Sequence, residues 1–180
     1  MATYTKEIGL AKPSVTDLVD INVINSNMDK IDKYASTLTQ MCTAYGASGA
    51  TSRITTAATT INLGTIIKNG DRFSPSGGGV KVNANGFIFA TAQIVTNNLR
   101  DLAPIWVSLV KNGSTDIGYV RLKAGENWET FTAVSKLTAV SKDDIITVKI
   151  KQENEDGGAA TGNVELGASF MNVMFYQDVN

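Results

Sequence analysis

The chain has 180 residues, of which 43% are hydrophobic, and its 16 basic and 17 acidic side chains are scattered without blocks. This length and composition suit one substantial folded domain with a smaller module, and they exclude a disordered protein. The absence of a basic stripe excludes nucleic acid as an expected partner, and no apolar stretch is long enough to predict a membrane span.

The residue types that most often carry catalysis are scarce. The chain has no histidine, the commonest general base and metal ligand, and Cys42 is its only cysteine. A single cysteine excludes an intrachain disulfide and a cysteine-based zinc site. We therefore expect a protein that is not an enzyme and needs no cofactor. The first six residues lack the apolar core of a secretory signal, so we expect synthesis in the cytoplasm without a signal peptide.

The N-terminal part of the chain predicts a helix with an apolar seam. Pro13 ends an extended segment, and Ser14 with Asp17 is typical of a helix start, where side-chain oxygens accept from free backbone N–H groups. Apolar residues then recur at alternating spacings of three and four, at Ile21, Ile24, Met28, Ile31, Ala35, Leu38 and Cys42. This period predicts a short coiled coil to about residues 40–43, and isoleucine at both seam positions of the first heptad favours three or more chains. The alternative is one amphipathic helix that packs on its own domain.

Small residues over positions 46–52 predict a boundary between two parts of the chain. Residues 1–45 would form an N-terminal anchor and trimerisation helix, and residues 50–180 a β-sandwich head domain. Beyond the boundary, short alternating segments separated by turns predict eight or more strands, typical of a mainly β sandwich or jelly roll. The segments are Thr59–Leu63, Val80–Val82, Gly86–Thr96, Ile105–Val110, Ile117–Leu122, Glu129–Ser135, Ile145–Gln152, Asn163–Ser169 and Met171–Gln177.

Three stretches of the expected head resemble the C1q/TNF-like jelly rolls. They are Gly-Phe-Ile-Phe-Ala-Thr-Ala at 86–92, Val-Lys-Asn-Gly at 110–113, and Val-Ser-Lys-Asp-Asp-Ile-Ile-Thr-Val at 140–148. The resemblance implies a C1q/TNF-like jelly-roll sandwich whose subunits pack as a compact homotrimer around a threefold axis. Two departures stand out: Asp143 occupies a position where the family usually has glycine, and Phe170 lacks the glycine that usually follows it.

The N-terminal segment resembles the leader of tail-fibre and baseplate-type proteins from phages and prophages of Gram-positive bacteria. The resemblance lies in a Gly-Leu-x-x-Pro segment at 9–13 and an Asn-x-Asn-x-x-x-Ile-Asp segment at 25–32. It implies a trimeric virion fibre or receptor-binding protein that joins other virion proteins through its N-terminus and attaches to a host-surface glycan or protein. The alternative is a purely structural virion component, such as a head fibre or capsid decoration protein. A bacterial surface or spore-coat protein of the same fold also remains open.

Candidate receptor contacts come from one exposed aromatic residue and one polar loop. Trp128 follows a turn at 125–127, and an indole ring can stack on the C–H face of a sugar. Asn97, Asn98 and Arg100 belong to a polar loop between long strands, where binding residues concentrate. Trp106 and Tyr119 are further stacking candidates. The alternative for each aromatic residue is packing in the core or at a subunit interface, and for the loop a simple connector.

Asp143 and Asp144 are the only candidate metal ligands, and they are weak ones. With Glu153, Glu155 and Asp156 they form the densest acidic region, whose oxygen atoms suit Ca²⁺. Their spacing matches no EF-hand loop, and the alternative is a turn with solvated carboxylates. Paired carboxylates also hydrolyse glycans, but no pair in the sequence is singled out for that chemistry.

Overall fold

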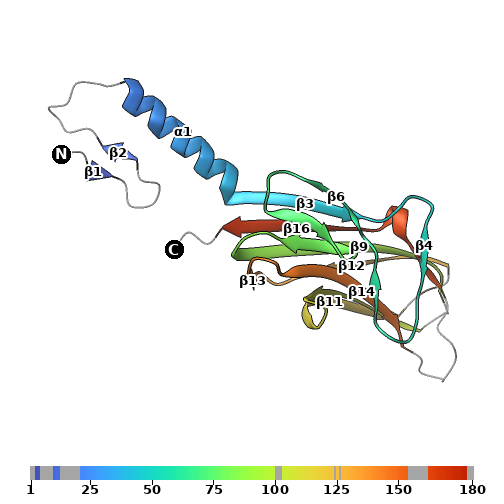
Figure 1. The fold of residues 1–180 in the computed structure, drawn as a ribbon. Helices are drawn as coiled ribbons and strands as arrows, with labels where there is room; N and C mark the ends of the chain where they lie inside the picture. Colours follow the sequence, from blue (N-terminus) through green and yellow to red (C-terminus); the bar gives the residue numbers. More distant parts are fainter. Residues whose placement is uncertain are drawn as a thin grey trace.

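The structure is a computed structural model that describes residues 3–4, 10–12, 21–99, 103–123, 125, 127–153 and 162–177. Of residues 3–4, 12, 21, 33–39 and 127 it describes the backbone alone. Two antiparallel sheets pack face to face, and one helix, α1 (Ile21–Leu38), leads away from one end of this sandwich (Figure 1). Within the described part of the chain, no helix has both the length and the apolar character that crossing a membrane requires.

Six strands form the smaller sheet of the sandwich. Its order is β11 (Thr115–Lys123), β10 (Pro104–Lys111), β14 (Ile145–Gln152), β8 (Gly79–Val82) and β7 (Phe73–Ser76), with β5 (Thr59–Ile61) also paired to β14. The Lys111–Asn112–Gly113 turn joins β10 to β11, as expected from its sequence. Asn112 and Gly113 both have positive φ, at 53° and 74°, a conformation that suits asparagine and glycine in a hairpin.

Eight strands form the larger sheet, which is built around the long strand β9. Its order is β4 (Thr51–Arg53), β15 (Asn163–Glu165), β9 (Gly86–Leu99), β16 (Phe170–Gln177), β3 (Thr39–Tyr45) and β6 (Thr65–Lys68), with β12 (Asn127–Val134) and β13 (Thr138–Val140) also paired to β9. A short 3-10 helix, η1 (Leu166–Ala168), joins β15 to β16, and β1 (Thr3–Tyr4) pairs with β2 (Ala11–Lys12) outside the sandwich.

The hydrophobic core lies between the two sheets, because each strand turns alternate side chains inward. Along β9 the pattern places Ile88, Ala90, Ala92 and Ile94 on the buried face, which confirms the alternation expected from the sequence. Phe175 packs edge-on against Phe73 across the core, with ring centroids 6.3 Å apart and an interplanar angle of 88°. Every strand expected from the sequence is present in the sandwich, although the stretch expected at Asn163–Ser169 is strand only to Glu165.

Cys42 lies in a strand of the head, and its assignment to the helical seam is wrong. The helix ends at Leu38, and residues 39–45 form β3, in which Cys42 pairs with Val173 of β16. From Gln40 the chain alternates buried and outward side chains with period two, which matches a strand, although Cys42 also continues the helical spacing. Burial in the sandwich raises the pKa of the Cys42 thiol to about 12, which agrees with an inert core residue.

The small-residue segment at 46–52 connects β3 to β4, two strands of the same sheet. It is packed: a Cβ atom added at Gly46 would lie 2.6 Å from the Cβ of Leu166, so the close approach requires glycine. Residues 39–45 of the expected anchor therefore belong to the sheet, because β3 pairs with β16 on one side and β6 on the other. The division of the chain into an anchor and a head stays a prediction.

Two truncations test where an independently folding head begins. Deleting residues 1–38 should leave a head that unfolds cooperatively, because all strands of both sheets of the sandwich remain. Deleting residues 1–45 also removes β3, uncovers the core beside β16 and should cost more than about 3 kcal/mol of unfolding free energy. Circular dichroism during thermal unfolding measures both. Equal melting curves for the two proteins would contradict the assignment of β3 to the head.

Candidate functional site

The exposed seam of α1 is the first candidate interaction surface. Ile24, Met28 and Ile31 are 44%, 53% and 39% exposed in the single chain. Their spacing of four and three places them on one side of the helix, so this part of α1 presents apolar side chains that do not pack on the head. The side chains of Ile21, Ala35 and Leu38 lie outside the described residues.

Asn27 of α1 connects the helix to Ala11 of β2 by hydrogen bonds. Its side-chain amide donates to the carbonyl oxygen of Ala11 at 3.0 Å, and its Oδ1 accepts from the Ala11 N–H at 3.0 Å. This pairing copies the two hydrogen bonds that a neighbouring strand would make with Ala11. Ala11, in the described part of the Gly-Leu-x-x-Pro segment, is therefore held beside Asn27 of α1.

The second candidate surface is the outward face of the eight-stranded sheet. On β9, β16 and β3 several of the side chains that point away from the core are large and apolar, and a polar row of Thr91, Asn172 and Thr43 separates Phe170 from the others. We call these apolar residues the apolar face: Met41, Phe87, Phe89, Phe170, Met174 and Tyr176.

The apolar face is continuous across three strands. Met174 stands opposite Phe89 on one neighbouring strand and opposite Met41 on the other, and Tyr176 stands opposite Phe87. All of these side chains are half-buried or exposed in the single chain, with Met41 at 45%. An antiparallel sheet normally has polar residues on its solvent side, so an apolar outward face indicates a surface that is covered in an assembly.

The structure brings three of the four expected receptor contacts together. A β-bulge leaves Trp128 without a direct partner, because Asn127 pairs with Leu99 and Glu129 pairs with Thr96. Trp128 therefore lies beside the end of β9 that carries Asn97 and Asn98, although these residues are 30 positions apart in sequence. Arg100, the fourth candidate, lies outside the described residues.

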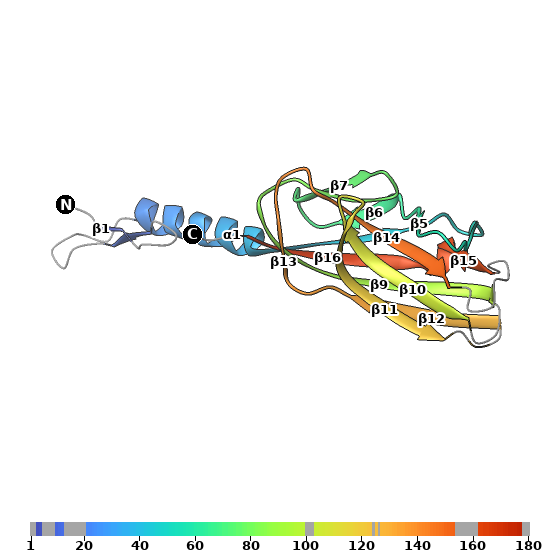
Figure 2. The same cartoon turned by 90° about the horizontal axis from the view of Figure 1, so that it is seen from below.

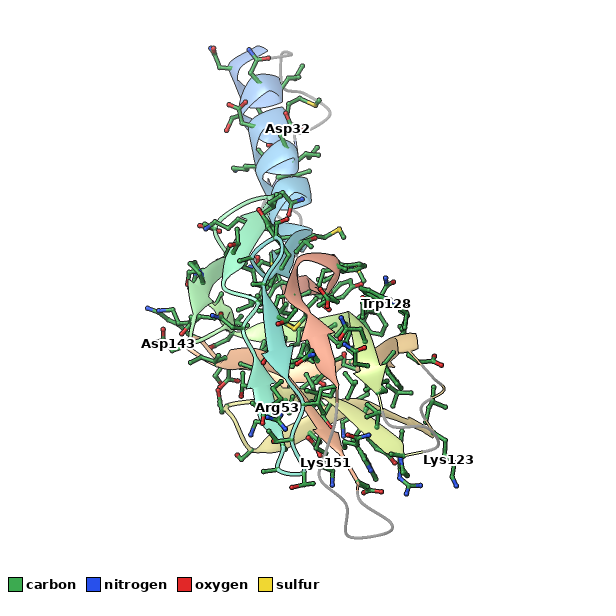
Figure 3. All side chains as sticks on the ribbon, turned by 90° about the vertical axis from the view of Figure 1, so that its right-hand side faces the viewer. Asp32, Arg53, Lys123, Trp128, Asp143 and Lys151 are labelled. Atoms are coloured by element: carbon green, nitrogen blue, oxygen red, sulfur yellow. The ribbon has the colours of Figure 1, made fainter. Side chains whose placement is uncertain are left out.

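Trp128 is the exposed member of this group. Its side chain is 64% exposed and lies on the flank of the head, on the side away from Asp143 (Figure 3). Asn97 is engaged within the head, since its Nδ2 donates to Glu165 and its Oδ1 accepts from Asn98 at 3.3 Å. Trp128 also points to the same side of the sheet as the apolar face, so an interface role stays open beside the receptor role.

The two remaining aromatic candidates lie on the other sheet. Trp106 is on β10 and Tyr119 on β11, and their ring centroids are 5.2 Å apart with an interplanar angle of 31°. The guanidinium of Arg121 lies 5.4 Å from the Trp106 ring centroid, and the Lys151 ammonium lies 5.0 Å from it. Both aromatic residues therefore belong to a cluster with cationic side chains.

Asp144 organises the turn before β14. One of its carboxylate oxygens accepts from the Asn112 amide at 2.7 Å, and the other accepts from the Ser141 N–H at 2.9 Å. Partial burial acts to raise the pKa of Asp144, but these hydrogen bonds and the nearby Lys111 ammonium outweigh it and hold the pKa below its usual range. Both oxygens thus already have protein donors.

Asp143 is the more exposed of the two acidic residues. Its carboxylate lies 3.4 Å from the Lys81 ammonium, and its φ of 73° is one that aspartate tolerates in turns. Among the described residues, no group of three or more histidine, cysteine, aspartate or glutamate side chains is placed to hold a metal ion. Glu155 and Asp156 lie outside those residues, and the calcium site stays a prediction.

The arrangement of the strands matches that of known structures. The structure of Eiger TNF from S. frugiperda aligns with a TM-score of 0.53 and 12% identity, covering 78% of this chain and 94% of that one. The fold is a TNF-like jelly roll. The crystal structure of murine APRIL at pH 5.0 aligns at 0.51 and 12% identity, covering 76% and 98% of the two chains. The PRD1 vertex protein P5 aligns at 0.50 and 15% identity, covering 79% and 98%. No protein-family model and no curated protein sequence matches the chain.

Asp144 should stabilise the head in a pH-dependent way. The substitution Asp144→Asn removes the charge that accepts from Asn112 and Ser141, and should lower the free energy of unfolding at pH 7 by about 1–3 kcal/mol. Because the pKa of Asp144 is lowered by folding, its stabilisation is present above the unfolded value near 3.9 and is lost as pH falls through the folded value. Urea unfolding at pH 7 and pH 3 should therefore show a difference that shrinks at pH 3.

The same substitution at the neighbouring position is a matched control. Asp143→Asn keeps a residue that tolerates the positive φ and removes only an exposed charge, so it should change stability by less than about 0.5 kcal/mol. If Asp143→Asn lowered the free energy of unfolding as much as Asp144→Asn does, the conclusion that Asp144 stabilises this turn would be contradicted.

Proposed function

We propose that this protein is a homotrimeric virion component that attaches to the surface of a bacterial host, by binding and without catalysis. The observation that carries the proposal is the apolar face of the eight-stranded sheet. Aromatic and methionine side chains on three adjacent strands are half-buried or exposed in the single chain, and burying their remaining apolar surface between subunits would stabilise the assembly by roughly 25 cal/mol per Å². A second and third copy of the chain are the proposed cover.

The helix also supports other copies of the chain as the cover of the apolar face. The apolar seam of α1 needs equivalent helices beside it, and α1 runs without interruption into β3, one of the strands that carries the apolar face. Subunits joined through the sheet would thus bring their helices together at one end. Isoleucine at seam positions 21 and 24 favours three chains over two.

The position of the leader suits attachment to a larger particle. Figure 2 shows α1 continuing along the long axis of the sandwich, so that β1 and the start of α1 lie at one end and the head at the other. We propose that the leader and α1 bind other virion proteins, while the head faces outward. The resemblance of the leader to phage tail-fibre and baseplate-type proteins supports this direction, and a phage vertex protein shares the fold.

Receptor contact is proposed for Trp128, Asn97, Asn98 and Arg100. Trp128 offers an exposed indole, and the asparagine residues lie next to it at the end of β9 farthest from α1. Three such sites on one trimer would act together on a repetitive cell surface, and avidity would raise the overall affinity without new contacts.

The alternative is a purely structural virion component, such as a head fibre or capsid decoration protein. The structural similarity to a vertex protein of phage PRD1 is the observation that favours it. Such a protein would use the same trimer and the same leader. Binding to host cells separates the two functions, because a decoration protein needs none.

Charge placed in the apolar face should break the trimer. In light scattering the wild-type protein should give three times the 19.1 kDa mass of the chain. Met174→Asp puts a carboxylate between Phe89 and Met41, where burial in an interface would leave it unpaired, so the mass should fall to that of one chain.

Thr60→Asp is the control for this substitution. It adds the same charge to an exposed position on β5, opposite Lys149 in the other sheet, and should leave the trimer intact. Far-UV circular dichroism confirms that each variant is folded. A wild-type protein with the mass of a single chain, or a trimeric Met174→Asp variant, would contradict the proposed interface.

Attachment should be visible with purified protein and whole cells. Fluorescently labelled trimer should bind some strains in a panel of Gram-positive bacteria, and Trp128→Ala should reduce that binding at least about fivefold. Leu137→Ala, which shortens another side chain that is 60% exposed, should leave it unchanged. Binding to no strain, with a trimer incorporated into virions, would favour the structural alternative.

A further inference from the structure

A pocket lies on the outward face of the six-stranded sheet, away from Trp128, Asn97 and Asn98 and beside the other two aromatic candidates, Trp106 and Tyr119. Two rows of paired residues define it. Arg121, Trp106 and Lys151 lie side by side in one row. In the next row, Ser108 of β10 stands between Tyr119 and Lys149. Because serine is short and its neighbours are long, the sheet surface is hollowed at Ser108.

The pocket has a volume of about 230 Å³, close to the lower end of typical ligand pockets at roughly 300–1,000 Å³. Trp106 and Ser108 line it from β10, and Lys149 and Lys151 line it from β14. Asp116 of β11 and Ala58, which precedes β5, complete the rim. The size suits a single ring of a small ligand.

One wall of the pocket is aromatic and held in place. Trp106 is half-buried, with the Tyr119 ring 5.2 Å from its own and two cationic groups within 5.4 Å of its centroid. Tyr119 is outside the pocket lining, but it stands opposite Ser108 on the neighbouring strand and is 60% exposed, so part of its ring is free to meet a ligand at the edge of the pocket. Aromatic rings offer apolar surface at a low cost in side-chain entropy, and the C–H face of a sugar ring is a suitable partner for them.

The opposite wall is cationic. Lys149 uses one ammonium hydrogen to donate to the Gly113 carbonyl oxygen at 2.6 Å, and an ammonium group has three donors. Lys151 lies 3.5 Å from the Glu153 carboxylate. Arg121 donates to that same carboxylate at 2.7 Å, and its hydrogen bonds lead the effects that hold the pKa of Glu153 below its usual range.

The charges around the pocket sum to a small positive excess. Arg121, Lys149 and Lys151 carry three positive charges, and the Glu153 and Asp116 carboxylates carry two negative ones, with Glu153 shared between Arg121 and Lys151. The pocket therefore combines an aromatic surface, two cations, one hydrogen-bond acceptor and the Ser108 hydroxyl. This set is complementary to a ligand with an apolar ring face, one negative charge and hydroxyl donors.

We infer that this pocket binds an anionic sugar residue, one that carries a carboxylate or a phosphate. The ring would stack on Tyr119 beside Trp106, and the anionic group would bind the Lys149 and Lys151 ammonium groups. Ring hydroxyls would donate to the Asp116 carboxylate and accept from Ser108. For its biological meaning the inference rests on the proposed attachment function, to which it adds the class of surface glycan.

The pocket is compatible with the proposed trimer. It lies on the outward face of the six-stranded sheet, whereas the apolar face belongs to the other sheet, and the core separates the two. Figure 3 shows Lys151 at the lower edge of the head, with the helix at the opposite side of the view. Three pockets of one trimer would thus remain open to solvent, each on the flank of its own subunit.

The two tryptophan residues of the chain allow a direct binding assay. The substitution Trp128→Phe in the full chain leaves Trp106 as the only tryptophan, so its fluorescence reports on the pocket. The probes are a galacturonic acid oligomer, a sugar phosphate, and a neutral galactose oligomer of matched length. The carboxylate sugar, the phosphate sugar or both should change the fluorescence at millimolar concentration, and the neutral sugar should not.

Variants of the pocket should separate stacking from charge recognition. Lys149→Gln and Tyr119→Ala should each weaken binding about tenfold in saturation-transfer NMR with the same probes. Lys142→Gln, which removes an exposed lysine from the turn before β14, should leave it unchanged. Raising the salt concentration should weaken binding of the anionic probe, because part of its affinity is electrostatic.

The outcomes distinguish this inference from the proposed function. Equal binding of the neutral and anionic sugars, or full binding by Lys149→Gln, would overturn the pocket as an anionic-sugar site. So would a failure of every anionic probe with a trimer that still binds host cells, and in that case the attachment function would stand. Anionic-sugar binding by a trimer that binds no cells would support the pocket and count against the attachment function.

Discussion

The eight-stranded sheet carries apolar side chains on both of its faces, and the proposed assembly follows from that constraint. One face supplies half of the jelly-roll core through residues such as Ile88 and Phe175. On the other face Phe87, Phe89 and Met174 are only half-buried in the single chain. Apolar sheet faces are normally covered, either within the chain or in an assembly. The second sheet covers one, and we propose that other copies of the chain cover the second.

We propose different roles for the two sheets, assembly for the eight-stranded sheet and ligand binding for the six-stranded sheet. The eight-stranded sheet carries the apolar face, continues through β3 into α1, and ends at the side where Trp128 meets Asn97. The six-stranded sheet contributes the other half of the core, and its outward face is polar and charged. That face holds the pocket at Ser108, the feature best suited to a soluble ligand. We propose that assembly uses the apolar face and that binding of an anionic sugar uses the opposite side of the sandwich.

Most strands of the head were predictable because each has a clear alternation bounded by turn residues. Short strands such as β6 and β7 were not, since three or four residues carry too little pattern to distinguish a strand from a loop. The sequence around Cys42 fits both a helix and a strand. Cys42 lies four residues after Leu38, as the helical seam requires, while the residues around it alternate between buried and outward side chains, as in a strand. The segment 39–45 is a strand because it pairs with β16. The apolar face itself was readable, because Phe87 and Phe89 alternate with Ile88 and Ala90, which makes β9 apolar on both sides.

The sequence by itself determined the class of fold, the seam of the helix and the absence of histidine-based chemistry, because periodicity and composition are local properties. Only the tertiary structure decided which residues meet. The pairing of β10 with β11 and β14 gathers Asp116, Ser108 and Lys149 around one pocket, and a bulge places Trp128 beside Asn97. These residues come from separate strands, and their proximity depends on strand order and register. Register is set by the burial of every side chain in the core at once, which no short segment of sequence records.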